Sequence, residues 1–257
     1  MFLTNSIAMN EAPRVDPRKA HGFLSYGECR FAVQRIAPLG ATEPVPSGWH
    51  EMLMRPQGRL GWIAPDRLVY ALYQRSGMLA IDRAVIHIGT DWLSRYGDGR
   101  SRLSINVHPE TLAQADGCDW LEQVLDNCCL DPACLSLEII EFGETVNLSR
   151  FTSELRQLRE LGVSIALDDY GNGTSNLSLL AEGCVDYLKL DRSIVSGMHD
   201  KRPYADLLFG IHRMAADLGV QTVAEGVETE RDVRLLEKLG INWAQGYYYS
   251  VPSLISE

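Results

Sequence analysis

The sequence predicts an α/β protein folded as a TIM-like (β/α)8 barrel, with an atypical first strand left as an open alternative. The chain has 257 residues, a length that suits one such barrel. Short β-rich runs alternate along it with amphipathic segments, which is the pattern of parallel strands joined by crossover helices. Eight predicted strands, enough to close a barrel, are Arg30–Ile36, Trp49–Met54, Leu103–Val107, Leu135–Ile140, Ser164–Leu167, Tyr187–Leu190, Thr222–Ala224 and Trp243–Tyr247.

The segments between these strands carry apolar residues at helical spacing, so we expect helices that coat the barrel. Two such stripes are Phe151, Leu155, Leu158 and Leu161, and Leu207, Ile211, Met214 and Leu218. Residues 1–27 show no periodicity and are rich in residues typical of loops. They are therefore predicted to be a flexible N-terminal lead-in to one domain that spans residues 28–257.

Bulk composition narrows the classes of function. The formal net charge is −10, which argues against a polynucleotide partner, because such binding depends on clustered Lys and Arg. A small anionic ligand held through metal ions stays open. No apolar run approaches the roughly 18 residues of a membrane span, and the N-terminus lacks a basic region followed by an apolar one. The sequence thus predicts no membrane partner and a cytoplasmic location.

Cysteine usage fits the same location. The chain has six cysteines without a C-x-x-C pair, and it is long enough to fold without disulfide bonds. We therefore expect reduced thiols. A zinc site at Cys128, Cys129 and Cys134 is the alternative, but this spacing matches no common ligand pattern.

Polar residues interrupt or end nearly every predicted strand, where buried parallel strands should be apolar. They are Glu51, Asn106, Glu138, Glu141, Asp168, Asp169, Lys189, Glu225 and Gln245. Taken singly, a carboxylate at a strand end is usually a cap or a solvated loop residue. Their recurrence favours a shared site instead, because the carboxyl ends of barrel strands meet at the rim that carries active sites.

The chemistry of this set indicates metal ions. Five carboxylates (Glu51, Glu138, Asp168, Asp169 and Glu225) would repel each other strongly without cations. Oxygen ligands without His or Cys suit Mg²⁺ or Mn²⁺, and two such ions are the usual arrangement for phosphodiester cleavage. Lys189 could orient or deprotonate the attacking water, or it could simply balance the acids in a salt bridge.

Five motifs, in order along the chain, resemble those of the EAL family of cyclic diguanylate (c-di-GMP) phosphodiesterases. They are Glu51-Met52-Leu53-Met54-Arg55, Asp168-Asp169-Tyr170-Gly171-Asn172-Gly173, Asp186-Tyr187-Leu188-Lys189-Leu190-Asp191-Arg192-Ser193, Ala224-Glu225-Gly226-Val227-Glu228-Thr229 and Gln245-Gly246-Tyr247. The resemblance runs from about Phe31 to Pro252. It implies hydrolysis of c-di-GMP to linear pGpG in bacterial signalling.

The resemblance also implies roles for individual residues. One metal would be held by Glu51, Asn106, Glu138 and Asp168, and the second by Asp168, Asp169 and Glu225. Lys189, together with Glu51, Asp169 and Glu225, would form the catalytic group, with Lys189 positioning the water. Substrate-binding positions are Gln34, Leu53, Arg55 and Gln245, and supporting positions are Glu141 and Glu228. Glu141 would steady the loop after Asp169, which in the family also contributes to dimerisation.

Some positions depart from the family pattern, and a second function stays open. Met52 and Arg35 replace the usual residues, and Asn172, Thr174 and Asn176 alter the loop that would couple a homodimer. No presumed metal ligand is lost, so we expect an Mg²⁺- or Mn²⁺-dependent enzyme that Ca²⁺ inhibits. The alternative is a catalytically silent EAL domain that acts as a c-di-GMP receptor or a protein-interaction module. A barrel glycosidase with paired carboxylates would need neither the lysine nor the asparagine. A regulatory protein partner is expected, but no recognisable sequence pattern identifies this partner or the input signal.

Overall fold

The computed structural model describes residues 29–40, 48–58, 61–62, 77–113, 117–139, 148–171, 177–199 and 202–255. The predicted lead-in, Glu141 and the loop positions Asn172, Thr174 and Asn176 lie outside these ranges. The described helices are α3 (Met78–Tyr96), α4 (Pro109–Leu112), α5 (Gly117–Asn127), the 3₁₀ helix η1 (Pro132–Cys134), α6 (Leu148–Leu161), α7 (Leu177–Ala181), α8 (Arg192–Gly197), α9 (Arg202–Asp217) and α10 (Glu230–Leu239).

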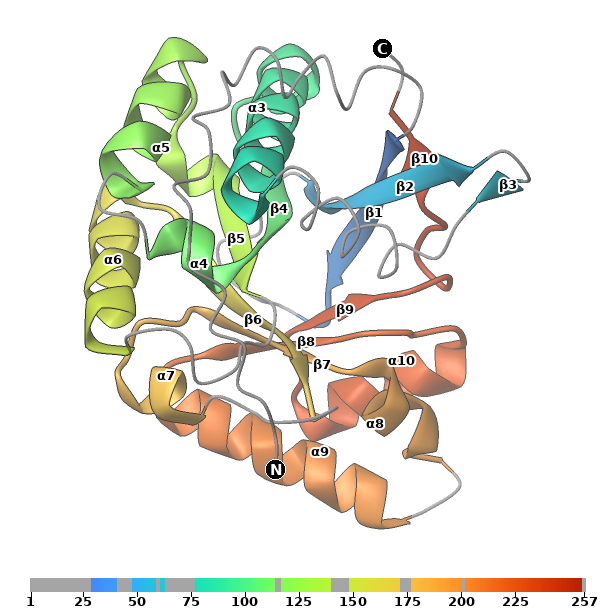
Figure 1. Ribbon diagram of the computed structural model, residues 1–257. Helices are drawn as coiled ribbons and strands as arrows, with labels where there is room; N and C mark the ends of the chain where they lie inside the picture. Colours follow the sequence, from blue (N-terminus) through green and yellow to red (C-terminus); the bar gives the residue numbers. More distant parts are fainter. Residues whose placement is uncertain are drawn as a thin grey trace, which may run out of the picture.

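Eight strands close into a barrel, as the sequence predicts. They are β1 (Cys29–Pro38), β2 (Trp49–Gly58), β4 (Arg102–Val107), β5 (Leu135–Ile139), β6 (Ser164–Tyr170), β7 (Tyr187–Leu190), β8 (Gln221–Ala224) and β9 (Trp243–Gln245). The spatial order is β1-β9-β8-β7-β6-β5-β4-β2, and β2 pairs with β1 to complete the ring. Two short strands, β3 (Gly61–Trp62) and β10 (Ser253–Leu254), extend β2 and β1 outside the ring (Figure 1).

The first strand is the atypical one. β1 runs antiparallel to both of its barrel neighbours, β2 and β9, whereas the pairs from β2 through β9 are parallel. Only residues 39–48 separate β1 from β2, and a parallel return needs a crossover of a dozen or more residues. The short connection therefore imposes the reversed direction.

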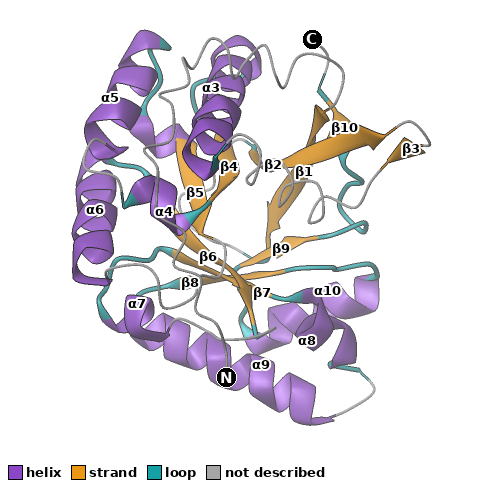
Figure 2. Ribbon diagram, viewed as in Figure 1, coloured by secondary structure: helices purple, strands orange, loops and turns teal. Residues whose placement is uncertain are grey.

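The helices pack around the outside of the parallel part of the barrel (Figures 1 and 2). In α6 the predicted stripe is confirmed, since Phe151, Leu155 and Leu158 are buried. In α9 the predicted stripe is confirmed at Ile211, which is buried, and at Met214, which packs against the core, but it is wrong at its two ends. Leu207 and Leu218 are 47% exposed, and Leu208 is fully buried instead. Apolar residues at both 207 and 208 made the start of the stripe ambiguous, because successive residues of a helix point about 100° apart.

Alternation along the strands divides the side chains between two environments. Leu103, Ile105 and Val107 of β4 point outward into the large core shared with the helices, because successive residues of a strand face opposite sides. A second, smaller core of inward-facing residues fills the barrel near the starts of its parallel strands: Ile36, Trp49, Ala166, Tyr187, Val223 and Trp243. The ring of Trp49 lies 4.6 Å from that of Tyr187 and 4.8 Å from that of Trp243. This aromatic plug closes one end of the barrel and leaves the other end to a polar layer.

Candidate active site

The polar layer consists of the next inward-facing residues, two positions further along each strand. The successive inward pairs are Trp49 and Glu51, Ser104 and Asn106, Ser136 and Glu138, Ala166 and Asp168, Tyr187 and Lys189, Val223 and Glu225, and Trp243 and Gln245. In the antiparallel β1 the order is reversed, and Gln34 precedes Ile36. The structure thus brings together at one end of the barrel those polar residues of the predicted strands that lie within the described ranges.

Lys189 lies at the centre of this layer. Its Nζ atom is 2.5 Å from Glu138 Oε2 and 2.8 Å from Glu225 Oε1. The same atom is 2.9 Å from Asp168 Oδ1 and 3.5 Å from Glu51 Oε2. The lysine side chain is only 2% exposed. One buried positive charge therefore faces four carboxyl groups.

Glu51 is held by two amide side chains. Asn106 Nδ2 donates a hydrogen bond to Glu51 Oε1 at 2.9 Å, and Gln245 Nε2 donates to Glu51 Oε2 at 2.6 Å. Gln245 Nε2 also lies 3.3 Å from Gln34 Oε1. Because Asn106 uses its nitrogen on Glu51, its carbonyl oxygen is the atom left to take a cation. Both amides thus fix the orientation of one carboxylate.

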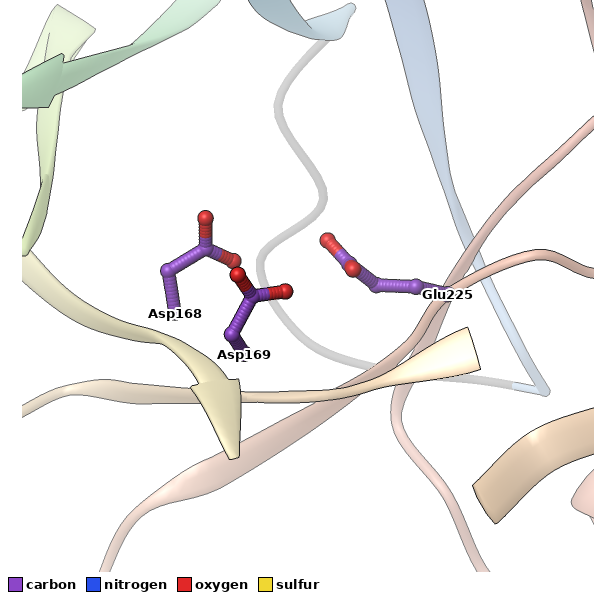
Figure 3. A group of neighbouring side chains, drawn as sticks. All are labelled: Asp168, Asp169 and Glu225. Carbon is purple, nitrogen blue, oxygen red and sulfur yellow. The ribbon is translucent and has the colours of Figure 1, made fainter. Parts of the chain in front are cut away.

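An irregularity in β6 places two consecutive aspartates in one site. Strict alternation would turn Asp169 away from Asp168, but the register of β6 against β7 shifts between Leu167 and Tyr170. Asp169 also adopts a left-handed backbone conformation with φ 54°, which non-glycine residues seldom adopt. As a result, carboxylate oxygens of Asp168, Asp169 and Glu225 all lie within 4.8 Å of one another, and Figure 3 shows the three side chains directed toward a common space.

The shortage of positive charge shows in the pKa values. Burial raises the pKa of Glu138 well above its usual value despite the nearby Lys189. Burial and neighbouring carboxylates raise the pKa of Glu225 to about 8 and that of Asp169 to about 6. Burial acts in the same direction on Glu51, but Lys189 and the bonds from Gln245 and Asn106 outweigh it and lower the pKa. Burial alone would lower the pKa of Lys189, yet the surrounding carboxylates raise it well above its usual value, so this group stays charged.

The residues present fit divalent cations. Glu138 Oε1 is buried and accepts no hydrogen bond from the described residues, a costly state for a carboxyl oxygen. The donor set is oxygen from carboxylates and one amide, the set preferred by Mg²⁺ and Mn²⁺. Within the described ranges, Asp168, Asp169 and Glu225 are the His, Cys, Asp or Glu residues grouped closely enough to hold an ion. The alternative zinc site at Cys128, Cys129 and Cys134 therefore gains no support, and all three cysteines are free.

A pocket of about 320 Å³ opens above this layer. Its walls include the four predicted substrate-binding residues: Gln34, Leu53, Arg55 and Gln245. Asp168, Lys189 and Glu225 also line it. The carboxylate cluster is therefore accessible to a ligand that the predicted binding residues would contact.

The chain is similar to known proteins over most of its length. A family model described as the EAL domain matches residues 49–252. The chain belongs to the EAL domain family. None of the described helices of this EAL domain is long and apolar enough to cross a membrane.

A relative of known family agrees with this assignment. The cyclic di-GMP phosphodiesterase PdeB of Shewanella oneidensis is 34% identical over 209 residues, which are 79% of this chain but 24% of PdeB. The chain therefore spans about a quarter of the length of that relative.

Two solved structures share the fold. A structure described as the PaMucR phosphodiesterase in complex with c-di-GMP matches with a TM-score of 0.79 at 24% identity, covering 92% of this chain and 95% of that one. The calcium and c-di-GMP complex of Klebsiella pneumoniae BlrP1 matches with a TM-score of 0.75 at 30% identity, covering 88% of this chain and 56% of that one.

Three residues that line the pocket of the EAL domain were not predicted to bind substrate: Arg192, Tyr247 and Glu228. Arg192 and Tyr247 line the pocket, although the sequence analysis gave them no function. Arg192 is the second residue after β7 and Tyr247 the second after β9, and position after a barrel strand was the signal that could have found them. Glu228 lines the pocket too, but its hydrogen bond is to Arg192 and not to the carboxylate cluster.

Proposed function

We propose that this EAL domain is a metal-dependent phosphodiesterase that hydrolyses c-di-GMP to linear pGpG and thereby lowers the level of this second messenger in bacterial signalling. The observation that carries the proposal is the burial of Lys189 among four carboxylates at the base of an open pocket. The names of PdeB and of the matching PaMucR structure support the choice of reaction and ligand.

The proposed metal ligands form two sets that share Asp168. Glu51, Asn106, Glu138 and Asp168 would hold one ion, and Asp168, Asp169 and Glu225 would hold the other. When bound, two Mg²⁺ or Mn²⁺ ions would activate water at neutral pH and stabilise the charge on the leaving oxygen. The calcium and c-di-GMP complex of BlrP1 supports a site that accepts divalent cations together with the dinucleotide.

The residues of the chain itself would bind and orient the reactants. Lys189 is positively charged and would hold the attacking water by hydrogen bonding to its oxygen. Arg55, on the pocket wall, would donate to a phosphate of the dinucleotide. Gln34, Leu53 and Gln245 would contact the rest of the ligand, and the buried Gln245 would also keep Glu51 in place.

We also propose that the domain acts in the cytoplasm as a homodimer, with a regulatory protein partner and without a polynucleotide substrate. The formal charge of −10 supports the last point, because long polyanions are repelled by an acidic protein. Sedimentation analysis tests the proposed homodimer. An assay of single-stranded RNA degradation tests the proposed absence of a polynucleotide substrate.

The decisive experiment is incubation of the protein with c-di-GMP and Mg²⁺, followed by chromatography of the nucleotides. The expected early product is pGpG, and Mn²⁺ should also support turnover. Ca²⁺ should permit binding but suppress turnover, because its looser coordination misplaces the water. Binding of c-di-GMP without turnover in either Mg²⁺ or Mn²⁺ would instead establish the receptor function.

A further inference from the structure

One buried carboxylate lies outside the polar layer of the barrel. Among the described residues, the buried Asp, Glu, Lys and Arg side chains are Glu51, Asp82, Glu138 and Lys189. Three of them belong to the carboxylate cluster, whereas Asp82 lies in α3 and is only 1% exposed. Burying a carboxylate is costly unless hydrogen bonds replace those to water, so the partners of Asp82 indicate its role.

Asp82 accepts two hydrogen bonds from the turn that follows β4. Its Oδ2 atom accepts from the backbone N–H of His108 at 2.9 Å and from the hydroxyl of Thr111 at 2.6 Å. His108 is the N-cap of α4, and Thr111 lies in that helix. One carboxylate oxygen of α3 therefore holds the point at which the chain leaves β4.

The same face of α3 packs along β4. Gly89 follows Asp82 by seven residues, which is about two helical turns, so both residues lie on one face. A Cβ atom on Gly89 would lie 2.5 Å from Ile105 Cδ1, so the glycine lets the helix lie close to the strand (Figure 1). Seven helical residues and three strand residues each span about 10 Å. The step from Gly89 back to Asp82 thus matches the step from Ile105 to His108, and the packing of α3 on β4 sets the place of Asp82.

The end of β4 that carries Asn106 is paired on one side only. Among the described strands, β4 is paired with β5 at Asn106, but its pairing with β2 ends at Ile105. The side chain of Asn106 nevertheless reaches β2, where it donates to Glu51 at 2.9 Å. No ladder with β2 holds the backbone at this point, and the bond from His108 N–H to Asp82 supplies an anchor two residues further along.

Resting on the function proposed above, we propose that Asp82 is a positioning residue for the reaction. By holding the turn after β4, it sets the place of Asn106, whose amide nitrogen orients Glu51 and whose carbonyl oxygen is left to take an ion. Residues that hold metal ligands in place typically change metal affinity about 10- to 100-fold when they are replaced. A looser turn should therefore weaken metal binding.

The test measures binding of Mn²⁺ alone to the protein, from the electron paramagnetic resonance signal of the free ion. Asp82→Leu removes both acceptor bonds, whereas Asp82→Asn keeps an amide oxygen that can accept them. Thr111→Val removes one donor and keeps the shape of the side chain. The matched control is Leu93→Ala, which removes a buried side chain from the same helix, about three turns from Asp82.

We expect Asp82→Leu to weaken Mn²⁺ binding about 10-fold or more, and Thr111→Val to weaken it by a smaller factor. Asp82→Asn should recover most of the affinity. In kinetic assays, the Mg²⁺ concentration for half-maximal activity should rise in Asp82→Leu, while the KM for c-di-GMP at saturating Mg²⁺ changes little. Leu93→Ala should lower the unfolding temperature but bind Mn²⁺ as the wild type does.

Wild-type Mn²⁺ affinity in Asp82→Leu, or an equal loss of affinity in Leu93→Ala, would overturn the inference and leave the proposed phosphodiesterase intact. Should Asp82→Leu fail to fold, Thr111→Val decides, since weaker Mn²⁺ binding supports the inference and wild-type binding overturns it. A wild type that binds neither Mn²⁺ nor c-di-GMP would overturn the proposed function itself. The two failures are therefore distinguishable.

Discussion

Nζ of Lys189 lies 2.5 Å from Oε2 of Glu138, and these side chains are only 2% and 0% exposed. The lysine is thus the positive charge nearest to a fully buried carboxylate. Breaking a buried pair by removing one partner leaves the other uncompensated. The metal-free protein should depend on this contact for its stability.

Lys189→Met should therefore destabilise the metal-free protein by about 3 kcal/mol or more, measured by chemical denaturation in a chelating buffer. Added Mg²⁺ should recover part of this loss, because cations replace the missing charge. Arg156→Met, which removes an exposed ion pair, should cost no more than about 1 kcal/mol. Equal losses in the two variants would contradict the assignment of Lys189 as the main counter-charge.

Catalysis should be more sensitive than ligand binding to two substitutions in the site. Lys189→Ala and Asp169→Asn should each lower kcat at least ~100-fold, the scale of one essential transition-state contact. The affinity for c-di-GMP with Ca²⁺ should change far less. Near-normal turnover by Lys189→Ala would show that the lysine only balances charge.

The stability of the metal-free protein should fall as the pH rises. Asp169 and Glu225 have pKa values raised to about 6 and about 8, whereas carboxyl groups of the unfolded chain titrate near about 4. The folded state therefore keeps protons that the unfolded chain has released, and the free energy of unfolding decreases with pH between about 4 and 8. Denaturation across this range in a chelating buffer measures the slope.

Glu225→Gln is the control for this titration, since it removes the group with the higher of the two pKa values. Its slope should be shallower above pH 6 than that of the wild type. Saturating Mg²⁺ should also oppose the fall, because metal binding favours the ionised carboxylates. A slope that is the same with and without Glu225 would argue against the raised pKa.

Arg55→Ala should raise the KM for c-di-GMP more than it lowers kcat. Arg55 lines the pocket and lies further along β2 than Glu51. A group that holds a phosphate contributes similarly to the ground state and the transition state. Steady-state kinetics separates the two constants. A lower kcat at unchanged KM would place Arg55 in the chemical step.

Gly246→Ala should damage both stability and activity. A Cβ atom there would lie 2.1 Å from the carbonyl oxygen and 2.3 Å from the nitrogen of Val227, so the segments that follow β9 and β8 would have to separate. We expect a loss of at least about 2 kcal/mol, by thermal or chemical denaturation. Gly210→Ala in α9 meets open space and should instead be neutral or stabilising by up to about 1 kcal/mol.

The sequence by itself determined the strands and the membership of the polar layer. Each strand of the barrel is short and β-rich, so local patterning located all eight. Glu138 and Lys189 were recognisable because a charged residue inside an apolar strand is costly unless it has a partner. The motifs then supplied the family, which the match over residues 49–252 confirms.

The tertiary structure alone decided how these pieces face one another. The antiparallel pairing of β1 with both β2 and β9 closes the ring, and packing against the barrel buries Leu208 and not Leu207 in α9. Asp169 joins the site only through the shifted register of β6. The ion pair between Arg192, at the start of α8, and Glu228 joins residues that are 36 positions apart in the chain. Local sequence encodes the preferences of one segment, whereas these features depend on contacts between distant segments, which form only when the barrel closes.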